Sequence, residues 1–398
     1  MTLNRRSFLG AVPTISLGLA AGAAQAQYGA ASAPASAPAS APASAAAPSP
    51  VSDYDTLVLL AGDALPRNPA AEGARLQALL ERHAKPVDSY LAGGAVAELE
   101  AKFSSLLGKE DTVFMPTGTL ANHIALRLLC GEAKHALVQQ ESHVYRDESN
   151  TVTTLSGINR APLAPGRAAP TLEEIGAAIE RAENGPYPIK VGAIALESPV
   201  RRAQGATLRP ELVAAIARLA REKRVAMHLD GARLLLMCGM AGFDVKDYCA
   251  HFDTVYVSLY KYLGAPFGAV LSGPKPLMAR ARELRHLFGG TLYHAWQAAL
   301  PALDALDGAP RRFAEVRAAG ERLLAALERT SGFTVQRVAD GSNQAAVLMS
   351  PQRMAGLEER LRAANVRVGK VNEGKVQLAF NESVLRRDTG YLVKALAG

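Results

Sequence analysis

The stretches AMHLDGARL (226–234) and TVYVSLYKYLGAPFG (254–268) decide the fold that this sequence predicts. Each opens with a short apolar run that lacks strict alternation, which is typical of a strand buried on both faces of a parallel sheet. Asp230 closes the first run, and Lys261 follows the second. Because ligands of parallel α/β sheets gather beyond the carboxyl ends of the strands, both side chains are candidate site residues.

The alternation of short apolar runs with helical periodicity extends on both sides of these stretches. Thr171 and Glu174 have capping-box spacing before one of the predicted helices. The predicted strands are 112–115, 136–139, 191–196, 225–229, 254–259 and 269–272, and the predicted helices are 120–129, 172–181, 210–223 and 276–287. This order indicates an α/β protein with a large, mostly parallel sheet covered by helices.

A smaller set of elements follows Trp296. The pattern predicts helices at 311–329, 351–364 and near 391–396, and strands at 333–337, 345–349 and 375–380. We therefore expect a large domain over residues 53–300, which includes the N-terminal segment of the folded body. A smaller C-terminal α/β domain is expected over residues 301–398.

Residues 1–26 have the pattern of an export signal. Arg5 and Arg6 precede Ser-Phe-Leu, an apolar stretch follows, and AQA (24–26) has the form of a cleavage site. The pattern predicts a twin-arginine signal peptide cleaved near Ala26, export by the twin-arginine (Tat) machinery and a periplasmic protein. A membrane helix is the alternative, but Pro13 and several small residues interrupt the stretch. No cysteine follows it to carry a lipid, so no stable membrane anchor is expected.

Composition separates a linker from the globular body. Residues 27–52 repeat Ala-Ser-Ala-Pro and lack the large apolar side chains that would offset ordering, so they predict a disordered linker. The whole chain of 398 residues is 49% hydrophobic and 20% charged, which is typical of a globular protein. Lys and Arg exceed Asp and Glu by seven without a basic run, so no nucleic-acid partner is expected. The three cysteines have no zinc-site spacing, and no metal is expected.

Thr117-Gly118-Thr119 and His143 also come soon after predicted strands. The TGT sequence opens a helix, so its hydroxyls and free backbone N–H groups suit a phosphate, although a plain helix cap is the alternative. His143 is either catalytic or an ordinary structural histidine. A buried Asp230 needs a partner, and an ion pair with Arg233 is the alternative to a ligand contact. A half-buried Lys261 has a depressed pKa that suits Schiff-base formation, whereas a surface lysine does not.

Together these groups follow the order expected for pyridoxal 5'-phosphate (PLP) on a large α/β domain. Lys261 would hold the aldehyde as an internal aldimine, and Asp230 would keep the ring nitrogen protonated so that the ring serves as an electron sink. His143 would stack on the ring. The phosphate would be held by Thr117, Gly118 and Thr119.

The chain resembles the threonine aldolase / β-eliminating lyase family of fold-type I PLP-dependent enzymes over roughly residues 55–300. The motifs that carry the resemblance are PTGTLANH (116–123), ESH (141–143), LSG (155–157), HLDGARL (228–234), SLYKYLGAPFG (258–268) and FGG (288–290). The resemblance implies a fold-type I transferase-like subunit and a homodimer or homotetramer with its active site at the subunit interface. It also implies that Ser258 contacts the cofactor and that Arg233 lies beside it, near the cofactor's phenolic oxygen or the substrate carboxylate.

The activity that the resemblance implies is retro-aldol cleavage of a β-hydroxy-α-amino acid, with threonine giving glycine and acetaldehyde. The substrate amine displaces Lys261, a base removes the β-hydroxyl proton, and the Cα–Cβ bond breaks. His143, acting directly or through a water, is the candidate base. The same carbanion can undergo β-elimination or racemisation instead, and a PLP-binding protein without turnover is a further alternative.

Two positions depart from the family pattern. Tyr293 stands where the family has an arginine after its FGG-type turn, and Gln377 stands where a second arginine anchors the substrate carboxylate. An amide does not replace a bidentate guanidinium, so the exact substrate and its stereochemistry stay open. Arg201 and Arg202 are candidates to reach the same cavity in its place.

Overall fold

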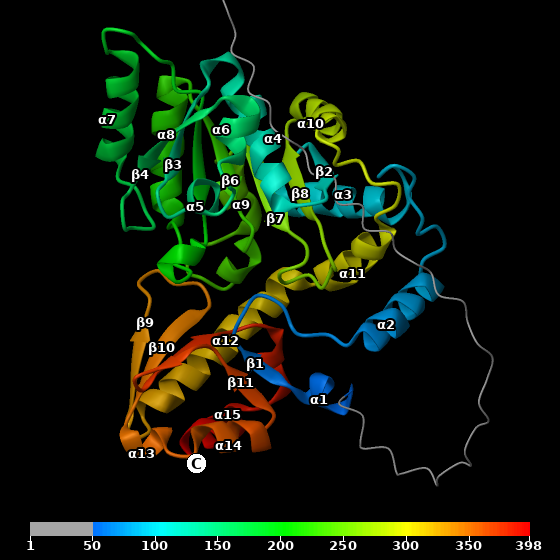
Figure 1. Ribbon diagram of the computed structural model, residues 1–398, viewed down its shortest axis with the longest axis vertical. Coiled ribbons are helices and arrows are strands. Elements are labelled where there is room, and N and C mark those ends of the chain that lie inside the picture. Colours follow the sequence, from blue (N-terminus) through cyan, green and yellow to red (C-terminus); the bar gives the residue numbers. More distant parts are fainter. Residues whose placement is uncertain (1–50) are drawn as a thin grey trace, which may run out of the picture. The chain divides into compact units, whose positions relative to one another are not determined.

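The computed structural model describes residues 51–398, and a seven-stranded sheet organises the larger part of this region (Figure 1). The strand order is β2-β8-β7-β6-β5-β3-β4, in which β8 runs antiparallel to both of its neighbours and the other pairs are parallel. The strands are β2 (Asp111–Met115), β3 (His135–Gln139), β4 (Asn159–Leu163), β5 (Ala193–Glu197), β6 (Ala226–Asp230), β7 (Thr254–Ser258) and β8 (Ala269–Gly273). The prediction of an α/β fold with a mostly parallel sheet is confirmed.

Helices cover this sheet because its central strands are apolar on both faces. Every residue of β3, β5 and β7 is buried. Helix α4 (Gly118–Cys130) packs against β6, β7 and β8, so its N-terminus lies close to the strand ends that carry the candidate residues. The other helices of this part are α2 (Pro69–Arg82), α3 (Gly94–Leu107), α5 (His143–Arg146), α6 (Thr151–Ser156), α7 (Leu172–Glu183), α8 (Pro210–Lys223), α9 (Val245–Ala250), α10 (Lys275–Leu287) and α11 (Trp296–Leu306).

A second hydrophobic core lies around a four-stranded antiparallel sheet of order β12-β13-β10-β9. Helix α12 (Ala309–Glu328) joins the two cores, since Phe313 packs in the first and Leu323 in the second. The other elements are β9 (Phe333–Arg337), β10 (Gln344–Met349), β11 (Val366–Val368), β12 (Val371–Asn372), β13 (Lys375–Ala379), α13 (Pro351–Met354), α14 (Leu357–Ala363) and α15 (Thr389–Ala397).

The N-terminal segment of the described chain belongs to this second core. After α1 (Val51–Thr56), strand β1 (Val58–Leu60) pairs in parallel with β11, and Val58 and Leu60 are fully buried there. Asn381 fixes the exit of the strand by donating from Nδ2 to the carbonyl of Leu59 at 2.7 Å. The residues that follow β1 are thereby held beside the C-terminal strands.

Most predicted elements occur within one or two residues of their expected bounds, and the differences have local causes. The helix expected over 351–364 is two helices, α13 and α14, because the chain turns at Gly356 with φ +66°. A left-handed conformation of this kind is one that glycine adopts without strain. Helices α2, α3 and α11 were not predicted, although their apolar residues repeat with helical spacing.

The predicted signal peptide (1–26) and nearly all of the predicted linker (27–52) lie outside the described residues. Within residues 51–398, no helix combines the length and the apolar character needed to cross a bilayer.

The capping box of α7 supplies a stability prediction. Thr171 Oγ1 accepts from the Glu174 backbone N–H at 3.2 Å, and Glu174 Oε2 accepts from the Thr171 N–H at 2.8 Å. We expect Thr171→Ala to lower the free energy of unfolding in urea by about 1 kcal/mol, because the helix N-terminus loses its cap. Thr171→Ser keeps the hydroxyl and is expected to stay near wild type. Equal stability of wild type and Thr171→Ala would contradict the role of the cap.

Candidate active site

Asp230 is the last residue of β6 and is only 2% exposed. Its Oδ2 accepts from Asn122 Nδ2 at 2.9 Å, and its Oδ1 accepts from the backbone N–H of Ala232 at 3.1 Å. These donors offset part of the cost of burying a carboxylate. Arg233 is not an ion-pair partner of Asp230 among the described residues, so the pair considered from the sequence does not form.

Asn122, on α4, joins three buried polar groups. Its Nδ2 donates to Glu148 Oε1 at 2.8 Å as well as to Asp230, and its Oδ1 lies 2.9 Å from His228 Nε2. Burial lowers the pKa of His228 to about 4, so the ring is neutral at physiological pH and carries its proton on Nε2. Thr254 Oγ1 lies 2.8 Å from the other ring nitrogen and donates to it. The amide of Asn122 is thus fixed in one orientation, in which its Nδ2 donates to the carboxylates of Glu148 and Asp230.

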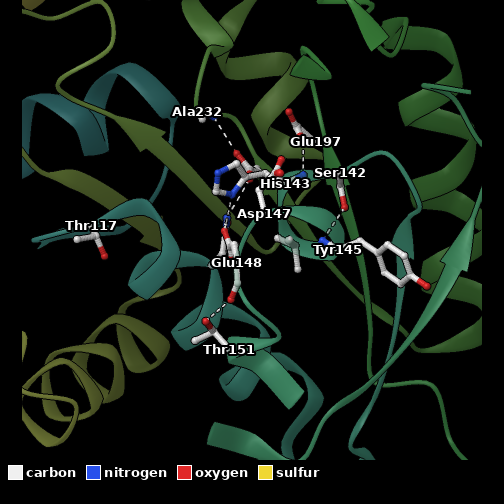
Figure 2. A network of polar contacts seen from close by, with 12 residues as sticks. Thr117, Ser142, His143, Tyr145, Asp147, Glu148, Thr151, Glu197 and Ala232 are labelled. Carbon is white, nitrogen blue, oxygen red and sulfur yellow. Dashed lines mark hydrogen bonds and ion pairs between the residues drawn. The ribbon is translucent and has the colours of Figure 1, made fainter. Parts of the chain in front are cut away.

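His143 begins α5 and faces Glu148 across a 2.9 Å hydrogen bond from Nδ1 to Oε1 (Figure 2). The Glu148 hydrogen bond raises the pKa of His143 above its ordinary value against the opposing effect of burial, and Asp230 adds to the rise. Desolvation raises the pKa of Glu148 as well. The backbone N–H of His143 donates to Glu197 Oε2 at 2.6 Å. His143 is therefore held by one hydrogen bond from its ring Nδ1 and one from its backbone N–H. Its Nε2 remains available to another partner.

Lys261 lies in the loop between β7 and β8 and is 7% exposed. Burial lowers the pKa of its amine, and the nearby guanidinium of Arg233 lowers it further, whereas Asp230 and Asp63 act in the opposite direction. A lowered pKa increases the fraction of neutral, nucleophilic amine. Its environment is that of a reactive lysine rather than of a surface lysine.

The start of α4 forms a cradle with open backbone N–H groups. Thr117 is the N-cap of α4, and its Oγ1 accepts from the Leu120 N–H at 3.2 Å. The helix cap that was the alternative to a phosphate site is therefore present. A Cβ at Gly118 would lie 2.0 Å from Tyr256 Oη, so only glycine fits there. Ser258 Oγ is buried without a hydrogen-bond partner in the part of the chain that the structure describes. The first-turn N–H groups and this hydroxyl are suited to an anionic group.

Arg233 is bound by Asp63, a residue that sequence reasoning missed. Its Nε and Nη2 donate to the two oxygens of Asp63 at 2.8 and 2.6 Å, and Tyr262 Oη donates to Asp63 Oδ1 at 2.8 Å. Asp63 lies far away in sequence, and no local motif marks it. Asn122 and Glu148 were also missed, although Asn122 lies inside PTGTLANH and Glu148 follows His143 by five residues.

The departures from the family pattern occupy different places. Tyr293 is 61% exposed and packs edge-on against Tyr90, with ring centroids 5.2 Å apart. Gln377 lines a cavity of about 230 Å³ together with Arg201 and Arg233. Arg202 does not line that cavity and binds Asp147 instead.

These residues fit PLP. The partnerless hydroxyl of Ser258 and the cradle that requires glycine at 118 suit a phosphate, while the buried acid Asp230 and the buried amine Lys261 suit a ring nitrogen and an aldehyde. Thr119 continues the cradle, and His143 lies close enough to Asp230 for that carboxylate to influence its pKa. In Figure 2, Thr117 stands apart from the His143 network, as separate contacts to a phosphate and a ring require.

The sheet, the cradle and the buried lysine with its acid define a fold-type I PLP-dependent protein. The family model of beta-eliminating lyases matches residues 83–349, and the chain belongs to this family. Two solved structures share the fold. A candidate L-allo-threonine aldolase from Listeria monocytogenes has a TM-score of 0.72 at 24% identity, covering 87% of this chain and 96% of that one. The Leishmania major threonine aldolase has a TM-score of 0.67 at 17% identity, covering 86% and 100%.

Two of the curated relatives are named for the same activity. The low-specificity L-threonine aldolase of Candida albicans is 30% identical over 214 residues, 52% of this chain and 56% of that protein. The low specificity L-threonine aldolase of Escherichia coli K12 is 28% identical over 296 residues, 74% of this chain and 86% of that protein. The chain spans little more than half the length of the fungal relative.

The contact between His143 and Glu148 yields a pH prediction. Glu148→Gln removes the carboxylate that raises the pKa of His143, so this pKa is expected to fall toward 6.5. Diethyl pyrocarbonate modifies only neutral imidazole, and peptide mass spectrometry of the cofactor-free protein reports the pH midpoint at each histidine. We expect the His143 midpoint to lie above 6.5 in wild type and to fall in the variant. An unchanged His143 midpoint would refute the assigned cause.

Proposed function

We propose that the protein is a PLP-dependent carbon–carbon lyase that cleaves a β-hydroxy-α-amino acid into glycine and an aldehyde. The observation that carries the proposal is the buried Lys261, which has a lowered pKa and lies within electrostatic range of the buried acid Asp230 at the carboxyl edge of the sheet. The names of the relatives support this reaction over others open to the same cofactor.

Each residue of the site has one task in this proposal. The first turn of α4 and Ser258 would hold the phosphate, Asp230 would bind the ring nitrogen, and His143 would lie against the ring. Lys261 would be the amine that binds the cofactor, and burial, by lowering its pKa, increases the neutral fraction that such a bond requires. When bound, the cofactor supplies an electron sink for the bond that breaks.

His143 is the proposed base for the β-hydroxyl proton. Glu148 accepts from Nδ1, which leaves Nε2 as the nitrogen that takes up a proton. The same hydrogen bond stabilises the imidazolium that results. Since it also raises the pKa of His143, the rate is expected to fall at acidic pH, where the ring is already protonated.

We also propose that the protein acts as a homodimer or homotetramer after export through the Tat machinery to the periplasm. Tyr90 and Tyr293 support an interface, because their rings contact each other and both are about three-fifths exposed. The Arg5-Arg6 pair and the apolar stretch after it support export. A route that carries folded proteins suits a chain that closes around a cytoplasmic cofactor.

Product analysis tests the activity. The PLP-loaded protein is incubated with a panel of β-hydroxy amino acids, and glycine, aldehydes, keto acids and ammonia are quantified. Glycine with an equal amount of aldehyde is expected, and Lys261→Ala is expected to abolish it while retaining the fold. Borohydride should fix a pyridoxyl group on Lys261. Keto acid with ammonia would establish elimination instead, and the absence of any product would leave a binding protein.

Export makes a separate prediction. Replacing Arg5 and Arg6 together by lysine keeps the charge but removes the pair that the export machinery reads. We expect the wild type in the periplasmic fraction with its mature chain beginning near Gln27, and the double variant in the cytoplasm with the signal retained. Asn4→Gln is the matched control and should be exported. Equal export of the double variant would exclude the twin-arginine route.

A further inference from the structure

We propose that Glu197 is a positioning residue that links the binding of a cation at Asp230 to the alignment of His143. A cation bound at Asp230 allows the neighbouring Glu197 to ionise, and the ionised carboxylate holds the backbone of His143. This inference rests on the proposed function, because the cation would be the protonated ring nitrogen of the cofactor. It assigns a task to a buried acid that the proposed reaction does not use.

Glu197 and Asp230 lie side by side at the carboxyl edge of the sheet. They are the last residues of the parallel neighbours β5 and β6, and the register of these strands pairs them directly. Residues paired in this way project to the same face of a sheet. Each is 2% exposed, so two acids are buried next to each other.

The carboxylate of Glu197 is an acceptor for two backbone segments. Its Oε2 accepts from the N–H of His143 at 2.6 Å (Figure 2), and its Oε1 accepts from the N–H of Arg201 at 2.8 Å. The backbone of Glu197 is fixed in turn by Gln139, at the end of β3. The Gln139 amide accepts from the Glu197 N–H and donates to the Glu197 carbonyl. The position of His143 therefore depends on an acceptor that the sheet itself holds in place.

The two acids have no cation of their own. Neither Glu197 nor Asp230 forms an ion pair with another residue in the described part of the chain. The basic side chains within electrostatic range of Glu197 include His143, Arg202, Arg233 and Lys261. The first three are bound to other carboxylates, and burial lowers the pKa of the fourth. A cation placed at Asp230 would therefore compensate charge that these side chains leave uncompensated.

Without such a cation, Glu197 tends to keep a proton. Burial raises its pKa, and the charge of Asp230 raises this pKa further. One oxygen of a protonated carboxyl carries a donor, so the group cannot accept equally well from the two N–H groups that it faces. In the cofactor-free protein the backbone of His143 is thus held less firmly.

Compensation of Asp230 reverses this balance. Once a protonated ring nitrogen neutralises its charge, Asp230 no longer opposes the ionisation of Glu197. The proton of Glu197 passes to solvent, and both carboxylate oxygens become acceptors. A ring beside Glu197 adds little further desolvation, because this side chain is already buried. Loading of the ring-nitrogen site therefore tightens the hydrogen bonds to His143 and Arg201.

Hydrogen–deuterium exchange at the His143 and Arg201 amides tests this link without measuring activity. The full chain is compared after loading with PLP and with 1-deazapyridoxal 5'-phosphate, which keeps the aldehyde and the phosphate but has carbon in place of the ring nitrogen. Mass spectrometry with fragmentation resolves the two amides. We expect exchange at both to be about 10-fold slower with PLP than with the analogue, because only PLP compensates Asp230.

Two variants separate the role of Glu197 from a general effect of binding. Glu197→Gln carries no charge to gain, so its two amides are expected to exchange equally fast with PLP and with the analogue. Glu141→Gln is the matched control, because it removes a carboxylate from the same segment that pairs with Arg146 instead. This control should retain the wild-type difference between the two cofactors.

The outcomes distinguish this inference from the proposed function. Equal exchange of the wild type with PLP and with the analogue overturns the role of Glu197, and so does a wild-type difference in Glu197→Gln. Loss of the difference in Glu141→Gln as well indicates a disturbed segment and also counts against the role. If Glu197→Gln does not fold, the two cofactors on the wild type decide. A wild-type spectrum that does not respond to PLP refutes the proposed lyase function itself.

Discussion

A carboxylate at the end of a buried strand needs donors that the strand cannot supply, and this requirement at Asp230 organises the surrounding structure. The backbone after β6 turns so that Ala232 donates one hydrogen bond, and α4 brings Asn122 across to donate another. Because α4 must lie against β6 for the second bond, its N-terminus is placed beside the end of β7, where Ser258 lies. The first turn of α4 and the buried acid are therefore brought together by one packing arrangement. In water the same carboxylate would be hydrated and would need neither the Ala232 N–H nor the Asn122 amide.

The remaining polar groups of the site follow from that arrangement through shared partners. Asn122 donates its second N–H to Glu148, and Glu148 accepts from His143, so Asp230 and the proposed base are linked through one amide. The neutral His228 donates from Nε2 to the amide oxygen of Asn122, which satisfies that oxygen without adding a charge. The influence of Asp230 on the pKa of His143 shows that the two are also linked electrostatically. Asp230 and Glu148 share the Asn122 amide as a donor, and each has a second donor, the Ala232 N–H for Asp230 and the His143 ring for Glu148.

The parts of this site that the sequence predicts are those encoded by local pattern. Asp230, Lys261 and the 117–119 turn each directly follow or lie near the end of an apolar strand, and the strands are recognisable from their composition. Asp63 could not be found in this way, since its partner Arg233 is 170 residues away and the pairing depends on tertiary packing. The break between α13 and α14 was missed because a single Gly356 in a helical pattern does not by itself end a helix. Hydrogen-bond partners of a buried group are set by the fold, whereas the need for them is visible in the sequence.

The position of Asp63 explains why both hydrophobic cores are needed for one site. Strand β1 is anchored in the second core by its pairing with β11, and three residues after it Asp63 reaches Arg233, which follows β6 of the first sheet. The Asp63–Arg233 pair is thus a contact between the parts of the chain that carry the two cores, as well as a feature of the cavity. The pair also compensates Arg233, whereas Arg201, which lines the same cavity after β5, is bound to Asp147 at 2.6 Å.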